Sequence, residues 1–162
     1  MTDSKASYHT CTLTAKRKGT AIMSGTRALL GEIELKVRWG DMDALGHVNN
    51  AVYFTYFEQI RVAWLERLSM TIGVSAHSGP VIVTACCAFH RPIIYPARLL
   101  VRMFGANVGR SSFETFYEIH DAQRPDTQHA SGSAKVVWVN HREGRSIPLP
   151  AELRQLLPGP TR

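Results

Sequence analysis

Hydrophobic and charged residues alternate between residues 32 and 39, which predicts a half-buried β-strand. The apolar positions of this alternation are Ile33, Leu35, Val37 and Trp39. Successive side chains of a strand point to opposite faces, so these four would share one face of a sheet. Residues 1 to about 30 show no lasting period. We therefore expect the folded part of the chain to begin close to this strand.

A helical period follows a loop at residues 40–49 that is rich in Gly, Asp and Asn. From about Asn50 to Leu68, apolar residues recur at helical spacing and form one face, at Tyr53, Phe57, Ile60, Trp64 and Leu68. Other apolar side chains widen this face until the helix is apolar nearly all round. A helix of this kind is usually buried, which requires the rest of the fold to wrap around it.

Four more strands are expected at about residues 80–90, 98–107, 112–120 and 128–139, because turn signals separate these apolar stretches. A short helix is expected from Ala151 to Leu157. Strands of this number and kind favour an antiparallel arrangement. The order of elements therefore predicts an α+β fold, with an antiparallel sheet of about five strands wrapped around one long central helix.

The length of 162 residues and an apolar content of 44% suit one domain with one core. We divide the chain into a disordered N-terminal extension (residues 1–31), the domain (32–157) and a C-terminal tail (158–162). The formal net charge is +6. Five of the 19 basic and one of the 13 acidic residues lie in the extension, so the rest carries 14 basic and 12 acidic side chains. This near balance argues against a nucleic-acid partner.

Three cysteines, at positions 11, 86 and 87, form no C-x-x-C motif. We therefore expect a reducing, cytoplasmic compartment and no structural zinc. The apolar stretch Val81–Phe89 is too short to span a bilayer, so no membrane partner is expected. The basic, acid-poor start fits either a transit peptide or a plain extension, and we favour the extension.

The loop before the helix holds Asp41, Asp43, His47, Asn49 and Asn50. A helix start presents unpaired N–H groups and the positive end of the helix dipole, which can stabilise a developing oxyanion. A nearby carboxylate can act as a nucleophile or as a general base for water. The loop therefore suits attack on a carbonyl carbon.

A purely structural interpretation of the same loop remains open. Asp, Gly and Asn are common in loops, and Asn49 or Asn50 also fits a helix cap. A metal site is not expected, because His47 is the only histidine in the loop and three firm ligands are hard to assemble.

The run from Arg38 to Tyr53, which contains D-x-D-x-x-G-H-V-N-N, resembles the signature of the 4-hydroxybenzoyl-CoA thioesterase-like family, whose members have the hotdog fold. Phe57-Glu58-Gln59-Ile60-Arg61 is also similar to that family's helix. The resemblance implies a sheet wrapped around one helix, a homodimer or homotetramer joined through the sheets, and active sites at the dimer interface. It implies hydrolysis of an acyl-CoA thioester to free acid and CoA, without a cofactor.

By position, the resemblance assigns the catalytic carboxylate to Asp43 and the oxyanion-binding amide to the helix start near Asn50. It leaves Asp41 as a structural residue, paired or capping in the loop. Arg110, in a turn before a strand, is expected to bind phosphates of coenzyme A. The expected substrate-binding residues are His47, Val48, Asn49, Tyr53, Glu58 and Arg110.

Several alternatives stay open at this stage. His47 fits either a substrate contact or a loop anchor, Tyr53 fits the core, and Glu58 fits an ion pair with Arg61. The carboxylate could act as nucleophile or general base. The His47-Val48-Asn49-Asn50 portion also resembles plant acyl-carrier-protein thioesterases, so an acyl-ACP thioesterase is one alternative function. A non-catalytic acyl-CoA-binding hotdog protein is the other.

Overall fold

The computed structural model describes residues 27–68 and 76–158, so residues 1–26 of the predicted extension and 159–162 of the predicted tail lie outside the described residues. The elements are β1 (Ala28–Lys36), the 3-10 turn η1 (Trp39–Asp41), α1 (Asn50–Arg67), β2 (Ser78–Phe89), β3 (Arg98–Ala106), β4 (Ser112–Asp121), β5 (Gln128–Asn140), β6 (Arg145–Ser146) and α2 (Ala151–Leu156).

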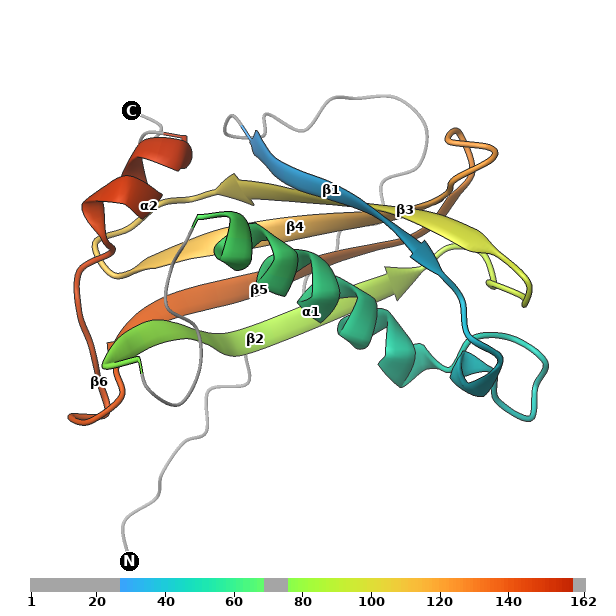
Figure 1. Ribbon diagram of the computed structural model, residues 1–162, viewed down its shortest axis with the longest axis horizontal. Helices are drawn as coiled ribbons and strands as arrows, with labels where there is room; N and C mark the ends of the chain where they lie inside the picture. The colour runs from blue at the N-terminus through green and yellow to red at the C-terminus, as the bar shows by residue number, and fades with distance from the viewer. Residues whose placement is uncertain (1–26, 69–75, 159–162) are drawn as a thin grey trace, which may run out of the picture.

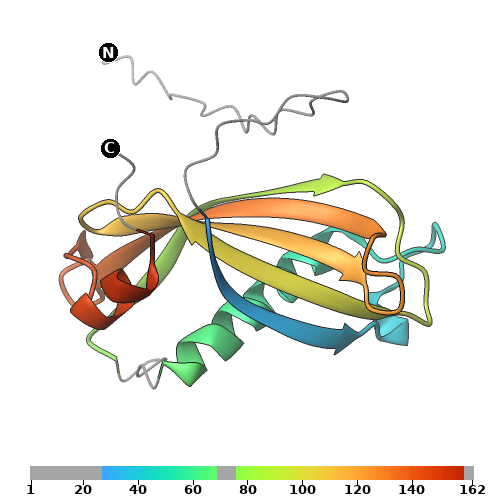
Figure 2. The same ribbon diagram turned by 90° about the horizontal axis from the view of Figure 1, so that it is seen from above.

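The strands form one antiparallel sheet in the order β1-β3-β4-β5-β2, and the two-residue β6 pairs with β5. Figures 1 and 2 show the curved sheet with α1 lying across its concave face. The predicted architecture of one long helix and an antiparallel sheet is therefore confirmed. Two details differ: β6 is an additional strand, and β1 begins at Ala28. A register shift between Leu29 and Gly31 breaks the alternation there, which hides the start of the strand from pattern analysis.

Helix α1 packs on the sheet through the apolar face that its spacing predicts. Tyr53, Phe57, Ile60 and Trp64 are each at most 5% exposed. The opposite side is open, with Phe54 38% and Val62 36% exposed. The prediction of a helix buried all round is therefore wrong for the single chain, because one sheet covers only one side of it.

Close contact between helix and sheet depends on a small residue in β5. The Phe57 ring stacks on Tyr117, with the ring centroids 4.5 Å apart. A Cβ atom at Gly132 would overlap the Phe57 ring and approach the Cys86 carbonyl oxygen to 2.9 Å. Glycine at this position therefore lets α1 lie close enough to the sheet to exclude water from the core.

Neither of the described ranges contains a helix long and apolar enough to cross a membrane. In the same ranges, no three His, Cys, Asp or Glu side chains gather closely enough to hold a metal ion.

Candidate active site

The loop between β1 and α1 folds as a small hairpin that fixes Asp43 at its start. Met42 and Val48 form an antiparallel bridge. The Asp43 N–H donates to the His47 carbonyl at 2.9 Å, and the Gly46 N–H donates to the Asp43 carbonyl at 3.1 Å. Gly46 has φ +80°, a left-handed conformation that glycine adopts without a steric penalty. The turn residues of the motif thus position the carboxylate.

The Asp43 carboxylate is partly held and partly available. Its Oδ1 accepts a hydrogen bond from the Leu45 N–H at 2.8 Å, and His47 Nδ1 lies 3.9 Å from the same oxygen. Within the described residues, Oδ2 accepts no hydrogen bond. The side chain is 22% exposed, so this oxygen is open to water or a ligand. A carboxylate oriented through one oxygen can use the other as a base or nucleophile.

Asp41 is a buried anchor. Its side chain accepts hydrogen bonds from the Arg38 N–H at 2.9 Å, from Arg38 Nε at 3.0 Å and from the Tyr56 hydroxyl at 2.9 Å. Burial favours the neutral acid, but the bonds from Arg38 and Tyr56 outweigh it and lower the pKa of Asp41. Asp41 is the last residue of η1, and its side chain connects Arg38 at the start of this turn with Tyr56 of α1. The prediction that Asp41 is paired within the loop is confirmed.

The start of α1 lies directly after this hairpin. Asn49 caps the helix, since its side-chain oxygen accepts a bond from the Ala51 N–H at 2.9 Å. Asn50 is the first residue of an 18-residue helix and is exposed. Its own N–H donates to no acceptor in the described part of the chain. An open amide at the positive end of a helix can bind an oxyanion.

A pocket of about 200 Å³ opens at this helix start, and it is lined by His47, Asn50, Tyr53, Phe89, His90, Arg91 and Pro92. Tyr53 is 2% exposed and meets the Phe89 ring edge-on, with centroids 4.9 Å apart. Neither Phe89 nor His90 is a predicted site residue, because only the pairing of β2 with β5 brings the end of β2 to the helix start. A period-2 apolar strand gives no signal for that contact.

Cys87 is not an available thiol nucleophile for this pocket. Cys87 is a free thiol on β2, and burial raises its pKa to about 11. It is therefore protonated at neutral pH, whereas thiol catalysis needs the thiolate. Asp43 remains the group that the loop itself presents for chemistry.

Comparison with known proteins places this loop in a family. The model of the thioesterase-like superfamily matches residues 37–157, which include the hairpin and all of α1. The chain belongs to this superfamily. A solved structure with a provisional thioesterase assignment, PA2801 from Pseudomonas aeruginosa, is 38% identical with a TM-score of 0.76, over 78% of this chain and 97% of that one.

Two further thioesterases are similar to this chain. One from Xanthomonas campestris, provisionally assigned as an acyl-CoA thioesterase, is 32% identical with a TM-score of 0.64, over 70% of this chain and 95% of that one. The chloroplastic acyl-acyl carrier protein thioesterase ATL3 of Arabidopsis thaliana is 31% identical over 76% of this chain and 65% of that protein. The fold is therefore the hotdog fold of this superfamily.

Three of the expected substrate-binding residues of this thioesterase-like chain lie away from the pocket at Asn50. The Val48 side chain is fully buried in the core. Glu58 lies eight residues along α1, about 12 Å from Asn50 at the rise of an α-helix. It lines a separate groove of about 190 Å³ between α1 and β2. Arg110 lies in the β3–β4 turn beside α2, at the opposite end of the sheet from the hairpin (Figure 1).

The anchoring role of Asp41 leads to a stability prediction. Asp41→Asn is expected to lower the free energy of unfolding at neutral pH by about 2 kcal/mol, because it weakens buried hydrogen bonds to a charged group. The folded-state pKa is lowered, so this stabilisation is complete above the unfolded-state pKa of about 4 and is lost as the pH falls through the folded-state value. Melting temperatures of both proteins from pH 7 to pH 2 should converge at the acid end. A difference that persists undiminished at pH 2 would contradict the role of the Asp41 charge.

Proposed function

We propose that this protein hydrolyses an acyl-CoA thioester to a free carboxylic acid and coenzyme A, with Asp43 as its catalytic carboxylate. One observation carries the proposal. A carboxylate with a free oxygen and an open helix-start amide belong to one short segment, between Asp43 and Asn50, beside a pocket. The superfamily match supports it, and so does the similarity to two proteins, one provisionally assigned as an acyl-CoA thioesterase and one named as an acyl-acyl carrier protein thioesterase.

The carboxylate and the amide divide the chemical work between them. In the general-base route, Asp43 takes a proton from water as the oxygen of that water bonds to the thioester carbon. The Asn50 N–H then stabilises the negative carbonyl oxygen. As the carbonyl re-forms, the carbon–sulfur bond breaks and the thiolate leaves as coenzyme A, taking up the proton. In the nucleophilic route, an Asp43 oxygen bonds to the carbon, the carbon–sulfur bond breaks and the coenzyme A thiolate leaves. Water then cleaves the resulting anhydride, which gives the free acid and the Asp43 carboxylate, and the thiolate takes up the remaining proton. Both routes need the ionised carboxylate.

The chain is proposed to act as a homodimer joined along β2, alone or as half of a homotetramer. This strand has 12 residues and lies at an edge of the sheet. Val81 and Val83 on it are 38% and 52% exposed. A long apolar edge invites pairing with another strand. Two-fold antiparallel pairing of β2 with its copy would bring the hairpin end of one sheet beside the Arg110 end of the other.

This dimer would complete the substrate site from two subunits. Arg110 of one subunit would then bind the coenzyme A phosphates of a thioester held at Asp43 of the other. The groove between α1 and β2, which is lined by Glu58, Ile82 and largely apolar neighbours, would lie beside the partner's pocket. It is proposed to take the acyl group. A coenzyme A substrate favours a cytoplasmic setting, since such thioesters are made and used inside cells.

A panel of thioesters tests the function directly. Short, medium, long and aromatic acyl groups are offered on coenzyme A and on acyl carrier protein, and free thiol release is followed with the full-length chain. The expected result is turnover of one acyl class on coenzyme A. Preference for the carrier protein would instead favour the function named for the Arabidopsis relative. No hydrolysis of any thioester on either carrier would reject the enzyme assignment, and saturable binding without hydrolysis would favour a non-catalytic acyl-CoA-binding protein.

A further inference from the structure

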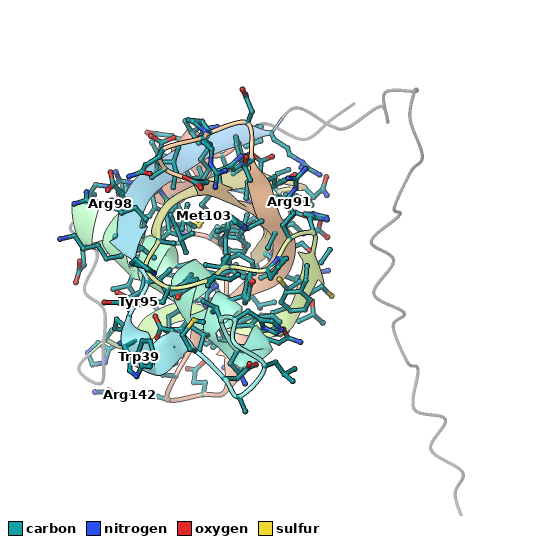
Figure 3. The ribbon with its side chains drawn as sticks, turned by 90° about the vertical axis from the view of Figure 1, so that its right-hand side faces the viewer. Trp39, Arg91, Tyr95, Arg98, Met103 and Arg142 are labelled. Atoms are coloured by element: carbon teal, nitrogen blue, oxygen red, sulfur yellow. The ribbon has the colours of Figure 1, made fainter. Side chains whose placement is uncertain are left out.

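Another cavity, apart from the pocket at Asn50 and the groove beside Glu58, lies at the end of the sheet where β1 ends and β3 begins. Its volume is about 700 Å³, and its walls come from the end of β1, the β2–β3 connection, the β4–β5 turn and His129, the second residue of β5. Figure 3 looks onto this end of the sheet, where Tyr95 and Arg98 of the cavity wall are labelled. Pro92 is the one residue that lines both this cavity and the pocket at Asn50. The two spaces are therefore neighbours, separated by the β2–β3 connection.

A β-bulge turns His129 toward this cavity. Ile119 pairs with Ala130 and His120 pairs with Gln128, so His129 is the extra residue on β5. Its carbonyl accepts two bonds, from the His90 and Arg91 N–H groups at 2.8 and 3.0 Å. The bulge breaks the alternation of the strand, and both His129 and Ala130 are buried. Bulges often redirect a side chain beside a functional site.

One nitrogen of the His129 ring, Nδ1, has no hydrogen-bond partner in the part of the chain that the structure describes. The residue is 8% exposed, and this nitrogen is itself buried. A buried polar atom without a partner costs free energy, and native proteins seldom keep one without a functional reason. A ring held by a bulge against a cavity can regain that bond from a ligand, after rotation of the imidazole about its Cβ–Cγ bond.

Charge at the cavity favours an anion of single charge. Arg98 pairs with Glu34 at 2.7 Å, and Arg124 pairs with Asp121 at 2.9 Å. Lys36 also lines the cavity, and no carboxylate among the described residues pairs with it. The positive charges of the two arginines are thus neutralised by carboxylates, and the ammonium group of Lys36 leaves one positive charge at the cavity.

Apolar side chains in the remaining walls of the cavity favour a ligand whose uncharged part is apolar. Val37, Ile94, Tyr95 and Pro96 contribute apolar surface beside these charges. Tyr95 also meets the Trp39 ring edge-on, with centroids 5.5 Å apart, which extends the apolar wall outward. Apolar walls with a few polar groups that fix orientation are typical of small-molecule sites.

We propose that this cavity is a second ligand site, which binds a monocarboxylate with an apolar or aromatic body. The carboxylate accepts an N–H bond from His129 and lies near the Lys36 ammonium, while the body packs on Tyr95 and Val37. The acid released by thioester hydrolysis belongs to this class, and only in this respect does the inference rest on the proposed function. A released acid that occupies the site would contact the β2–β3 connection, which also borders the reaction pocket.

Calorimetric titration of the full chain with benzoate and with hexanoate tests the site, and benzamide serves as the uncharged control. Lys36→Met and His129→Leu are each expected to raise the Kd of the better carboxylate about tenfold or more, since each removes a contact to a charged group. Lys135→Met, which removes an exposed lysine of β5 outside the cavity, should leave the Kd unchanged. Benzamide should bind far more weakly than benzoate.

Stability separates a ligand contact from a structural role of the histidine. His129→Leu should leave the melting temperature unchanged or raised, because it replaces a ring whose buried Nδ1 has no partner among the described residues with an apolar side chain. A carboxylate Kd that neither cavity variant changes would overturn the proposal, and so would equal affinity for benzamide. The titrations are repeated in Asp43→Asn, where the same affinity is expected. If the parent protein binds carboxylates at this site but hydrolyses no thioester, the second site stands and only the proposed function is rejected.

Discussion

Asp43→Asn is expected to lower kcat by about a hundredfold or more while the protein stays folded, judging by the usual contribution of a general base. Asparagine keeps the size of the side chain and an oxygen that can accept the Leu45 N–H bond. It removes the negative charge and the basicity that both proposed routes require. The position is partly exposed and lies in a loop, so little stability depends on it.

The informative control for this variant is Asp41→Asn in the same loop. Asp41 is bonded to Arg38 and Tyr56, so its substitution should lower the melting temperature and affect turnover less. kcat and melting temperature are measured for both variants on the best thioester of the panel. Full activity in Asp43→Asn would reject the mechanism. Activity lost only in Asp41→Asn, with normal stability, would mean that the buried aspartate performs the chemistry.

The elements of the fold could be predicted because their periods are strong and local. The apolar spacing from Tyr53 to Leu68 predicts α1, which ends at Arg67 in the structure. The strands also lie within a few residues of the predicted ranges. The exposed side of α1 was missed, because Phe54 and Val62 look like core residues until the sheet of a single chain is seen to cover one face.

The candidate site was predictable only where it is local in sequence. The loop before α1, the cap at Asn49 and the pairing of Asp41 all lie within one short segment. Residue types predicted the loop and the cap, and the family resemblance assigned the structural role to Asp41. The Phe89 wall of the pocket depends on strand pairing, and the His129 bulge depends on the register between β4 and β5. Neither has a pattern of its own, since register is set by the partner strand.

Arg110→Ala is expected to raise KM for acyl-CoA about tenfold and to change kcat little, because a charge-assisted bond to phosphate contributes to binding rather than to the chemical step. Higher salt should also weaken binding in the parent protein. Arg102→Ala is the matched control, since Arg102 is a partly exposed arginine on β3 that pairs with Glu32. An unchanged KM with collapsed turnover would reject the assignment of Arg110.

Mixing Asp43→Asn and Arg110→Ala chains is expected to give a kcat/KM higher than that of either variant alone. Within one chain the two residues lie at opposite ends of the sheet, so a shared site requires the partner subunit. A hybrid dimer would have one site with native Asp43 from one chain and native Arg110 from the other. Random exchange makes half of the dimers hybrid, and one of the two sites in each hybrid is native. About a quarter of all sites in the mixture are therefore restored. The measurement is kcat/KM at low substrate after unfolding and refolding the mixture, with light scattering to establish the oligomer. A mixture no more active than the average of its components, or a monomer of 18.1 kDa, would refute a site built from two subunits.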